Sequence, residues 1–222
     1  MERIMTHVKI CCIASFEEAK LAIKCGASAI GLVSEMPSGP GVISEAIIKK
    51  IAEQTPPTIS TFLLTSKQNV DEIIEQYHRC RTNTIQLCDE ITAGTHIQLK
   101  NALPGIKIVQ VIHVYDKSSI NEAIKISNSV DAILLDSGNQ RLATKELGGT
   151  GRIHDWSISR EIVESVKIPV YLAGGLNPQN VDEAILQVNP YGVDVCSGVR
   201  TNSNLDEEKL KLFFDRVKSV NK

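Results

Sequence analysis

Short apolar runs alternate with amphipathic patterns of helical period along the chain. The apolar runs are rich in Val, Ile and Leu and are too short for stable helices, so they predict buried strands. The predicted strands span residues 8–13, 29–33, 58–64, 84–87, 107–111, 132–135, 170–173 and 193–195. The helical patterns that follow them span residues 15–25, 44–54, 69–80, 92–103, 118–128, 155–166, 177–187 and 206–217.

Local signals mark where two of these helices begin. Ser15 and Glu18 have the spacing of a capping box, in which each side chain accepts a hydrogen bond from the other residue's backbone N–H. Pro178 follows Asn177, and proline is favoured at the first helical position because its missing N–H is not needed there. We therefore expect one helix to open at Ser15 and another to have Pro178 in its first turn.

Eight strand–helix units with short connections, within 222 residues, indicate the fold class. An unbroken alternation of strands and helices implies a parallel sheet with right-handed crossovers, which is either doubly wound or closed. A doubly wound sheet normally has fewer strands and a glycine-rich turn after its first strand, whereas the glycines here cluster late. We predict an α/β fold, a single (β/α)8 TIM barrel that spans residues 1–222 as one domain.

Composition and charge narrow the classes of function. The net charge of −2 and the lack of a basic stripe argue against nucleic acid as a partner. No apolar run approaches the ~20 residues of a membrane span, and the N-terminus lacks a secretory signal pattern, so we expect no membrane partner. The six cysteines show no metal-ligand spacing, which indicates reduced thiols, no metal site and a cytoplasmic location.

The sixth predicted strand ends on an acid. Asp136 follows the apolar residues 132–135, and a polar loop leads from it to the glycine cluster at residues 148–151. A buried strand that delivers a carboxylate to its C-terminal end, followed by a long loop, is how α/β folds build reactive sites. The alternative interpretation is that Asp136 is a helix cap or an ordinary loop acid.

The last two predicted strands end in pairs of small residues. Gly174-Gly175 follows the seventh strand and Ser197-Gly198 follows the eighth. Glycines let backbone amides approach a ligand closely, helix N-termini attract anions, and these two loops are the usual phosphate site of barrels. We therefore expect a phosphorylated small-molecule substrate, although the same pairs could simply make tight turns.

The first predicted strand ends in two cysteines. Cys11 suits a buried strand as a small apolar residue, and as a thiolate it could also act as a general base. We expect Cys12 to point to the opposite side of the strand because neighbouring side chains alternate. A metal site from the vicinal pair is not expected, because no further His or Cys ligands gather at a recognisable spacing.

Together these strand ends resemble the phosphoribosylanthranilate isomerase family, (β/α)8 enzymes of tryptophan biosynthesis. The resemblance covers nearly the whole chain, and its motifs occur in the family's order. They are Lys9-Ile10-Cys11, with Cys12 in the place of a glycine, the small residues 26–31, Leu134-Leu135-Asp136, Gly148-Gly149-Thr150-Gly151, Asp155-Trp156, and residues 174–181 and 193–199.

The resemblance implies an Amadori rearrangement without a cofactor, which converts an N-linked aminoaldose phosphate into an aminoketose phosphate. It implies that Asp136 is the general acid that opens the furanose ring and that Cys11 is the general base that removes the proton from carbon 2. It also implies a set of residues that bind the substrate, the amine near Asp194 and the phosphate near the glycines. This set is Gly149, Gly151, Gly174, Gly175, Asp194, Ser197 and Gly198. We expect a monomer or a homodimer.

Departures from the family pattern gather at the aromatic end of the expected pocket. Gly41 stands where the resemblance places an arginine near the anthranilate group, and Cys88-Asp89 replaces a His-Gly pair. Glycine cannot replace a guanidinium that pairs with a carboxylate, whereas Arg141 and Lys145 could restore positive charge. Two alternatives therefore stay open: a related isomerase of another phosphorylated aminosugar or sugar, and a non-catalytic protein that binds a phosphate ligand.

Overall fold

Eight parallel strands close into a barrel in a computed structural model that describes residues 5–138, 142, 144–148 and 151–221. Neighbouring strands follow chain order, and β1 pairs with β8 through residues such as Lys9 and Asp194. The barrel strands are β1 (His7–Ile10), β2 (Ala29–Val33), β3 (Ser60–Thr65), β4 (Thr84–Leu87), β5 (Lys107–His113), β6 (Ala132–Asp136), β7 (Val170–Leu172) and β8 (Gly192–Val195). The predicted (β/α)8 architecture is confirmed.

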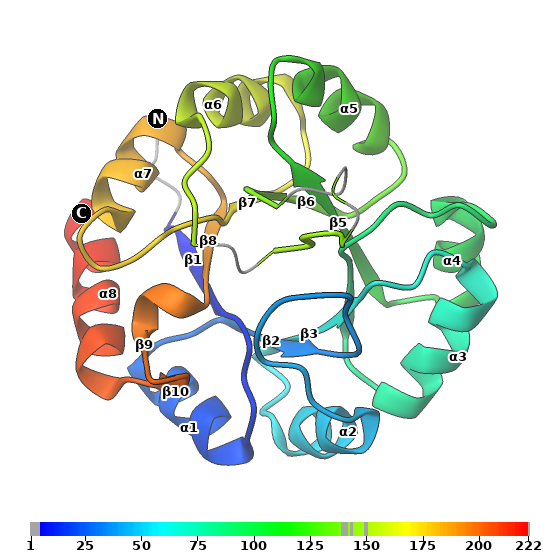
Figure 1. Ribbon diagram of the computed structural model, residues 1–222, viewed down its shortest axis with the longest axis horizontal. Coiled ribbons are helices and arrows are strands. Elements are labelled where there is room, and N and C mark those ends of the chain that lie inside the picture. The colour runs from blue at the N-terminus through cyan, green and yellow to red at the C-terminus, as the bar shows by residue number, and fades with distance from the viewer. Residues whose placement is uncertain (1–4, 139–141, 143, 149–150, 222) are drawn as a thin grey trace.

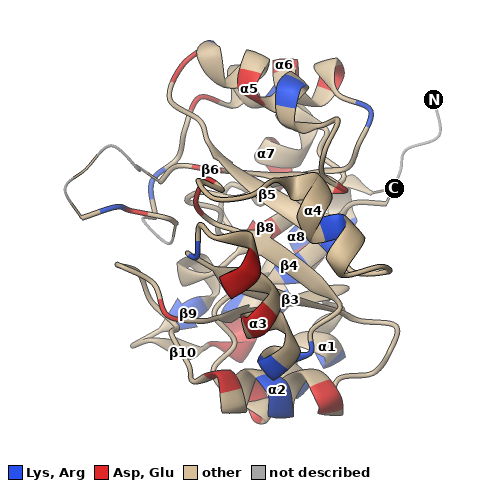
Figure 2. Ribbon diagram, turned by 90° about the vertical axis from the view of Figure 1, so that its right-hand side faces the viewer, with Lys and Arg blue, Asp and Glu red and all other residues tan. Residues whose placement is uncertain are grey.

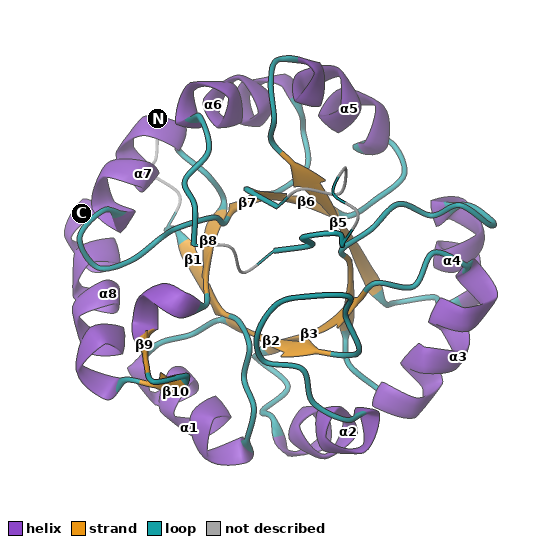
Figure 3. Ribbon diagram, viewed as in Figure 1, coloured by secondary structure: helices purple, strands orange, loops and turns teal. Residues whose placement is uncertain are grey.

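Helices form an outer ring around the barrel, as Figure 1 and Figure 3 show. They are α1 (Phe16–Cys25), α2 (Glu45–Gln54), α3 (Val70–Cys80), α4 (His96–Ala102), α5 (Ser118–Ile126), α6 (Trp156–Ser165), α7 (Val181–Val188) and α8 (Glu207–Val220). A 3-10 turn, η1 (Ser197–Val199), and a small antiparallel pair, β9 (Arg200–Thr201) and β10 (Asn204–Leu205), precede α8. The sequence patterns did not predict these last three elements.

Two predicted helix starts are wrong, and local turns explain both. The α4 helix begins at His96 and not at residue 92, because Gly94 has a φ of +94° and Thr95 caps the helix by accepting from the Gln98 N–H. The α7 helix begins at Val181, so Pro178 lies in the preceding turn. There the side chain of Asn177 accepts from the Gln179 N–H, which holds the chain in a turn instead of a helix.

The alternation of side chains along each strand creates two cores. Val8 and Ile10 of β1 face the helices, as do Ile133 and Leu135 of β6, and they belong to the larger core between barrel and helices. The intervening residues face the barrel interior, where Phe62 and other apolar side chains form a second, smaller core. Because successive strand residues point to opposite sides, a polar residue between two apolar ones points into the barrel.

Charged residues of both signs are interspersed over the outer helices, as Figure 2 shows. Within the described part of the chain, no helix has the length and apolar character needed to cross a membrane. Over the same residues, no group of three or more His, Cys, Asp or Glu side chains is arranged to hold a metal ion.

Candidate active site

A pocket opens at the C-terminal ends of the strands. Cys11 borders it beyond β1, Asp136 at the end of β6, Gly174 beyond β7 and Cys196 beyond β8. The described residues that line it are Cys11, Cys12, Val33, Met36, Ser38, Gly39, Pro40, Leu64, Gln86, Cys88, Asp136, Leu147, Gly148, Gly151, Ala173, Gly174, Gly175, Leu176, Asp194, Val195, Cys196 and Ser197. The candidate acid and the candidate base thus share one pocket.

Asp136 presents a buried carboxyl group to this pocket. The residue is 8% exposed, and its side chain accepts a hydrogen bond from the Ser137 N–H at 2.6 Å. Burial raises the pKa of Asp136 to about 6, with the negative charge of Asp194 acting in the same direction and the Ser137 hydrogen bond opposing it. A carboxyl group with this pKa carries a proton in an appreciable fraction of molecules near neutral pH, as a general acid requires.

Gly148 lets the loop after β6 close onto Asp136. A Cβ added at Gly148, which has a φ of +137°, would lie 2.7 Å from Oδ2 of Asp136. Only glycine fits this space without displacing the carboxyl group, and its backbone conformation is one that other residues rarely adopt. The glycine cluster therefore begins with a residue that shapes the surroundings of the candidate acid.

Cys11 continues the barrel beyond the last residue of β1. Its backbone N–H donates to the carbonyl oxygen of Val195 at 2.8 Å, and its side chain is 6% exposed. Its Sγ atom lies above Gly31 of β2, where an added Cβ would be 2.9 Å from the sulfur and 3.1 Å from Nζ of Lys9. The absence of a side chain at Gly31 thus makes room for the thiol and the ammonium group inside the barrel.

The expectation that Cys12 points away from Cys11 is wrong, since both residues line the pocket. The strand ends at Ile10, and Cys12 has a φ of +60°, so the alternation of side chains no longer applies there. The Sγ atoms of Cys12 and Cys196 lie 2.6 Å apart. Cys12 therefore faces the loop after β8.

Asp194 lines the pocket next to a buried lysine. Nζ of Lys9 lies 3.0 Å from Oδ1 of Asp194 and 5.1 Å from the ring centroid of Phe62, and the Lys9 side chain is fully buried. Burial by itself lowers the pKa of Lys9, but nearby acidic groups, the Asp194 carboxylate foremost among them, outweigh burial and raise this pKa above its ordinary value. The two side chains therefore form an ion pair in the barrel floor.

The small residues after β7 and β8 border one side of the pocket. Gly174, Gly175 and Ser197 line it, and Gly174 and Gly175 have φ angles of +85° and +66°. Added Cβ atoms at these two glycines would collide with or crowd residues 152–154. Side chains there would thus push apart the two loops that border the pocket.

The other predicted phosphate residues differ in position. Gly151 lines the pocket, and a Cβ added there would lie 3.9 Å from Oγ of Ser197. Gly198 is not among the lining residues, and its backbone packs against the Leu176 carbonyl oxygen so closely that an added Cβ would overlap it. Gly149 lies outside the described residues, so the structure does not test its predicted role.

The opposite side of the pocket is apolar, with Val33, Met36, Leu64 and Leu147 among its lining residues. Among the described lining residues there is no arginine or lysine. A Cβ added at Gly41, whose φ is +79°, would lie 2.5 Å from Cβ of Cys12. The position that the family pattern assigns to arginine therefore has no room for a side chain.

Neither Lys145 nor Arg141, the two basic residues considered for the aromatic end, is among the described residues that line the pocket. Nζ of Lys145 lies 2.6 Å from Oδ2 of Asp89, and this ion pair borders neighbouring hollows instead of the pocket itself. Arg141 lies outside the described residues. Lys145 therefore pairs with Asp89, the acid that stands where the family pattern has a glycine.

Sequence reasoning assigned no role to Lys9, Arg200 or Cys196. Lys9 precedes Cys11 by two residues and so shares its face of the strand, and this period-two spacing was the signal that could have revealed it. Arg200 pairs with Glu18 at 2.8 Å and donates to the carbonyl oxygen of Cys12 at 2.6 Å. No local pattern links residues so far apart in the chain.

Comparison with known proteins identifies the family. The family model for N-(5'phosphoribosyl)anthranilate (PRA) isomerase matches residues 8–216. The chain belongs to the phosphoribosylanthranilate isomerase family. The N-(5'-phosphoribosyl)anthranilate isomerase 2 of Methanosarcina mazei is 41% identical over 215 residues, which make up 96% of this chain and 94% of the relative. The corresponding isomerase of Methanocella arvoryzae is 34% identical and covers 96% of this chain and 99% of the relative.

Solved structures agree with this assignment. The phosphoribosyl anthranilate isomerase of Thermotoga maritima superposes with a TM-score of 0.81 at 28% identity, covering 97% of this chain and 100% of that chain. A structure of a phosphoribosyl anthranilate isomerase in complex with reduced 1-(o-carboxyphenylamino)-1-deoxyribulose 5-phosphate has a TM-score of 0.79 at 27% identity with the same coverage. The expected family, fold and function, an isomerase of tryptophan biosynthesis, are confirmed.

Proposed function

We propose that this chain converts N-(5'-phosphoribosyl)anthranilate into its aminoketose phosphate with Cys11 as general base and Asp136 as general acid. The observation that carries the proposal is that both side chains line one pocket, from β1 and β6, beside the glycine loops after β7 and β8. The related isomerase bound to a carboxyphenylamino deoxyribulose phosphate supports a ligand with one phosphate end and one aromatic end.

Asp136 initiates the reaction in this proposal. Its protonated carboxyl group donates a proton to the furanose ring oxygen, the carbon–oxygen bond breaks, and a Schiff base forms between carbon 1 and the amine nitrogen. The raised pKa of Asp136, about 6, keeps this proton available on a buried carboxyl group.

Cys11 completes the rearrangement. Its thiolate removes the proton from carbon 2, and the resulting enolamine tautomerises to the ketone, so no atom is gained or lost. Nζ of Lys9 adjoins the same space above Gly31 as the Cys11 sulfur. Asp194, which lines the pocket and holds Lys9, contributes the acid that we place near the substrate's amine.

The phosphate lies against Gly151, Gly174, Gly175 and Ser197 in this proposal, together with Gly149 and Gly198. Backbone N–H groups of glycine-rich loops and a helical turn such as η1 suit an anion, because glycine lets them approach it closely. The ring of the anthranilate then points to the apolar side with Val33, Met36 and Leu64. This orientation places carbons 1 and 2 between the acid and the base.

The first experiment is a steady-state assay that follows the loss of anthranilate fluorescence from freshly generated phosphoribosylanthranilate. We expect Asp136→Asn and Cys11→Ser each to lower kcat by about 10²–10⁴-fold, since each removes one proton-transfer group. Asp131→Asn and Cys25→Ser are matched controls away from the pocket and should turn over normally. Near-normal turnover in either pocket variant would refute the acid–base assignment.

A second candidate is the same rearrangement on a phosphorylated aminosugar whose amine carries no carboxylate. The apolar end without an arginine or lysine among its described lining residues favours it. Comparing kcat/KM for phosphoribosylanthranilate with that for the matching aniline derivative separates the two. A higher value for the aniline derivative would assign the substrate without a carboxylate to this chain.

We further propose that residues 1–222 form a single domain and that the chain is a monomer or a homodimer in the cytoplasm. The family model spans 8–216, which supports one barrel unit. One related structure concerns monomers generated from the dimeric isomerase of Thermotoga maritima, so the barrel of that relative is described both as a dimer and as a monomer. Light scattering of the purified chain measures its mass, and a trimer or larger assembly would contradict this expectation.

A further inference from the structure

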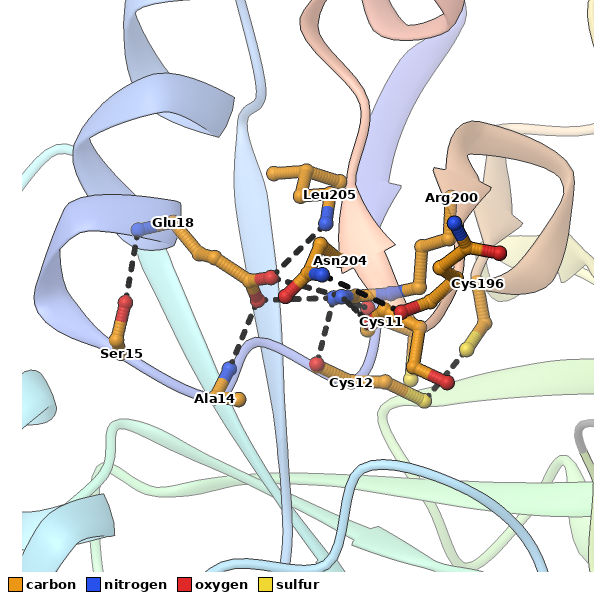
Figure 4. Close-up of polar contacts among 11 residues, drawn as sticks. Cys11, Cys12, Ala14, Ser15, Glu18, Cys196, Arg200, Asn204 and Leu205 are labelled. Carbon is orange, nitrogen blue, oxygen red and sulfur yellow. Dashed lines mark hydrogen bonds and ion pairs between the residues drawn. The ribbon is translucent and has the colours of Figure 1, made fainter.

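Two thiols from opposite ends of the chain meet at the rim of the pocket. Cys12 follows β1 and Cys196 follows β8, and Figure 4 shows their side chains pointing toward each other. Their Sγ atoms lie 2.6 Å apart. A disulfide needs about 2.05 Å between sulfur atoms, so only a small further approach separates this pair from a covalent bond. Cys196 is partly exposed and lines the pocket, which gives a small oxidant access to it.

The surroundings make the two thiols chemically unequal. The hydrogen bond with Cys12 lowers the pKa of Cys196, and the positive charge of Arg200 acts in the same direction. Hydrogen bonds with Cys11 and Cys196, together with burial, raise the pKa of Cys12. This difference favours Cys196 as the sulfur that reacts first with an oxidant and Cys12 as the thiol that then reacts with the product.

The backbone around the pair is held in place. Arg200 donates to the carbonyl oxygen of Cys12 at 2.6 Å and to that of Cys11 at 3.4 Å, and Glu18 fixes the guanidinium group. Glu18 also accepts from the backbone N–H groups of Ala14 and Leu205. This network joins the loop after β1 to the segment after β8, so the two sulfurs meet without a large movement of the chain.

We propose that Cys12 and Cys196 form a reversible disulfide that turns the active site off under oxidation by a peroxide. Cys196 loses its proton, its thiolate attacks a peroxide oxygen and the O–O bond breaks; a sulfenic acid forms, and the leaving hydroxide takes up that proton to become water. The Cys12 thiol then attacks this sulfur and a second water leaves, so two thiols and one hydrogen peroxide give one disulfide and two waters. A dithiol reverses the step by thiol–disulfide exchange.

The bond would act on both halves of the site. Cys12 adjoins the candidate base Cys11, and once Cys12 is in a disulfide its thiol no longer hydrogen-bonds with Cys11. Cys196 directly precedes Ser197 of the proposed phosphate loop. A covalent link fixes these two loops relative to each other, so we expect turnover to fall while the barrel stays folded. The loss of turnover rests on the function proposed above, whereas formation of the bond does not.

The experiment oxidises the full chain with hydrogen peroxide and then measures thiols, peptides and turnover. We expect the number of free thiols in denaturant to fall by two from the six of the sequence. Tryptic digestion should yield residues 10–20 linked to residues 168–200, and fragmentation should place the link at Cys12. Turnover should drop at least tenfold and return with dithiothreitol.

Variants separate this disulfide from direct oxidation of the candidate base. Cys196→Ser should form no linked peptide and should keep most of its own initial turnover after the same treatment. Cys25→Ser, which removes a partly exposed thiol at the end of α1, is the matched control and should respond as the natural chain does. The proposal is overturned if no link forms, if the link joins Cys11 to Cys12, or if Cys196→Ser is inactivated to the same extent.

Discussion

The backbone of Gly41 lies directly against the side chain of Cys12. A Cβ added at Gly41 would be 2.5 Å from Cβ and 2.9 Å from Cα of Cys12, closer than real carbon atoms approach. Both positions depart from the pattern of the family that the sequence resembles, which has glycine at residue 12 and arginine at residue 41. The structure therefore links the two departures, because the Cys12 side chain occupies the space that a side chain at residue 41 would need.

We expect Gly41→Arg alone to unfold at a lower temperature than the natural chain, because its Cβ collides with Cys12 and its backbone has a φ of +79°. Cys12→Gly in the same chain should recover part of the loss, with a coupling free energy of about 0.5–3 kcal/mol. A double-mutant cycle from denaturant unfolding measures this coupling. Additive effects would show that the contact does not connect the two positions.

The raised pKa of Asp136 predicts that Asp136→Asn stabilises the protein at neutral pH although it lowers kcat. The folded protein binds this proton with a pKa of about 6, compared with 3.8 for an ordinary aspartate. The folded state therefore holds more protons between these values, and its stability falls as pH rises through them, by up to about 3 kcal/mol. Asparagine has no such loss, so its advantage should grow from pH 4.5 and level off above pH 6.

Urea denaturation at about pH 4.5 and pH 7.5 measures this difference. Asp131→Asn is a control of opposite sign: the Ile108 N–H and Lys100 outweigh burial and lower the pKa of Asp131. Its replacement should destabilise the protein at pH 7.5, and the loss should shrink as pH falls. A stability difference for Asp136→Asn that does not change with pH would disprove the raised pKa.

Gly148→Ala should impair turnover more than its backbone strain alone explains. The added Cβ would lie 2.7 Å from Oδ2 of Asp136, so the carboxyl group must move away from its present position. Gly105→Ala is the matched control, because Gly105 also has a positive φ, +88°, and an added Cβ meets nothing within 4 Å. Equal losses of kcat in the two variants would mean that the close approach to Asp136 has no catalytic consequence.

The barrel and the inward direction of its two pocket carboxylates could be predicted from the sequence, because both follow from the alternation of side chains along the strands. Asp136 follows an apolar residue that faces the helices, and Asp194 lies between two such residues. The alternation of side chains along the strand therefore predicts that both carboxyl groups point into the barrel. The contact of Gly41 with Cys12 and that of Lys145 with Asp89 were not predictable, because loops from different strands meet only when the barrel closes. Cys12 also escaped prediction, since its φ of +60° ends the alternation.

The ion pair of Lys9 and Asp194 predicts a large penalty when only one partner is removed. Lys9→Met leaves a buried carboxylate without its ammonium group, which costs about 3–5 kcal/mol of unfolding free energy unless Asp194 takes up a proton. The loss should therefore be greater at pH 7.5 than at pH 4.5, and Lys9→Met/Asp194→Leu should regain most of it. Lys49→Met breaks an ion pair with Glu53 whose side chains are 45% and 55% exposed, so as a surface control it should cost less than about 1 kcal/mol. If Lys9→Met proves no more costly than Lys49→Met at neutral pH, the buried pair does not stabilise the barrel floor.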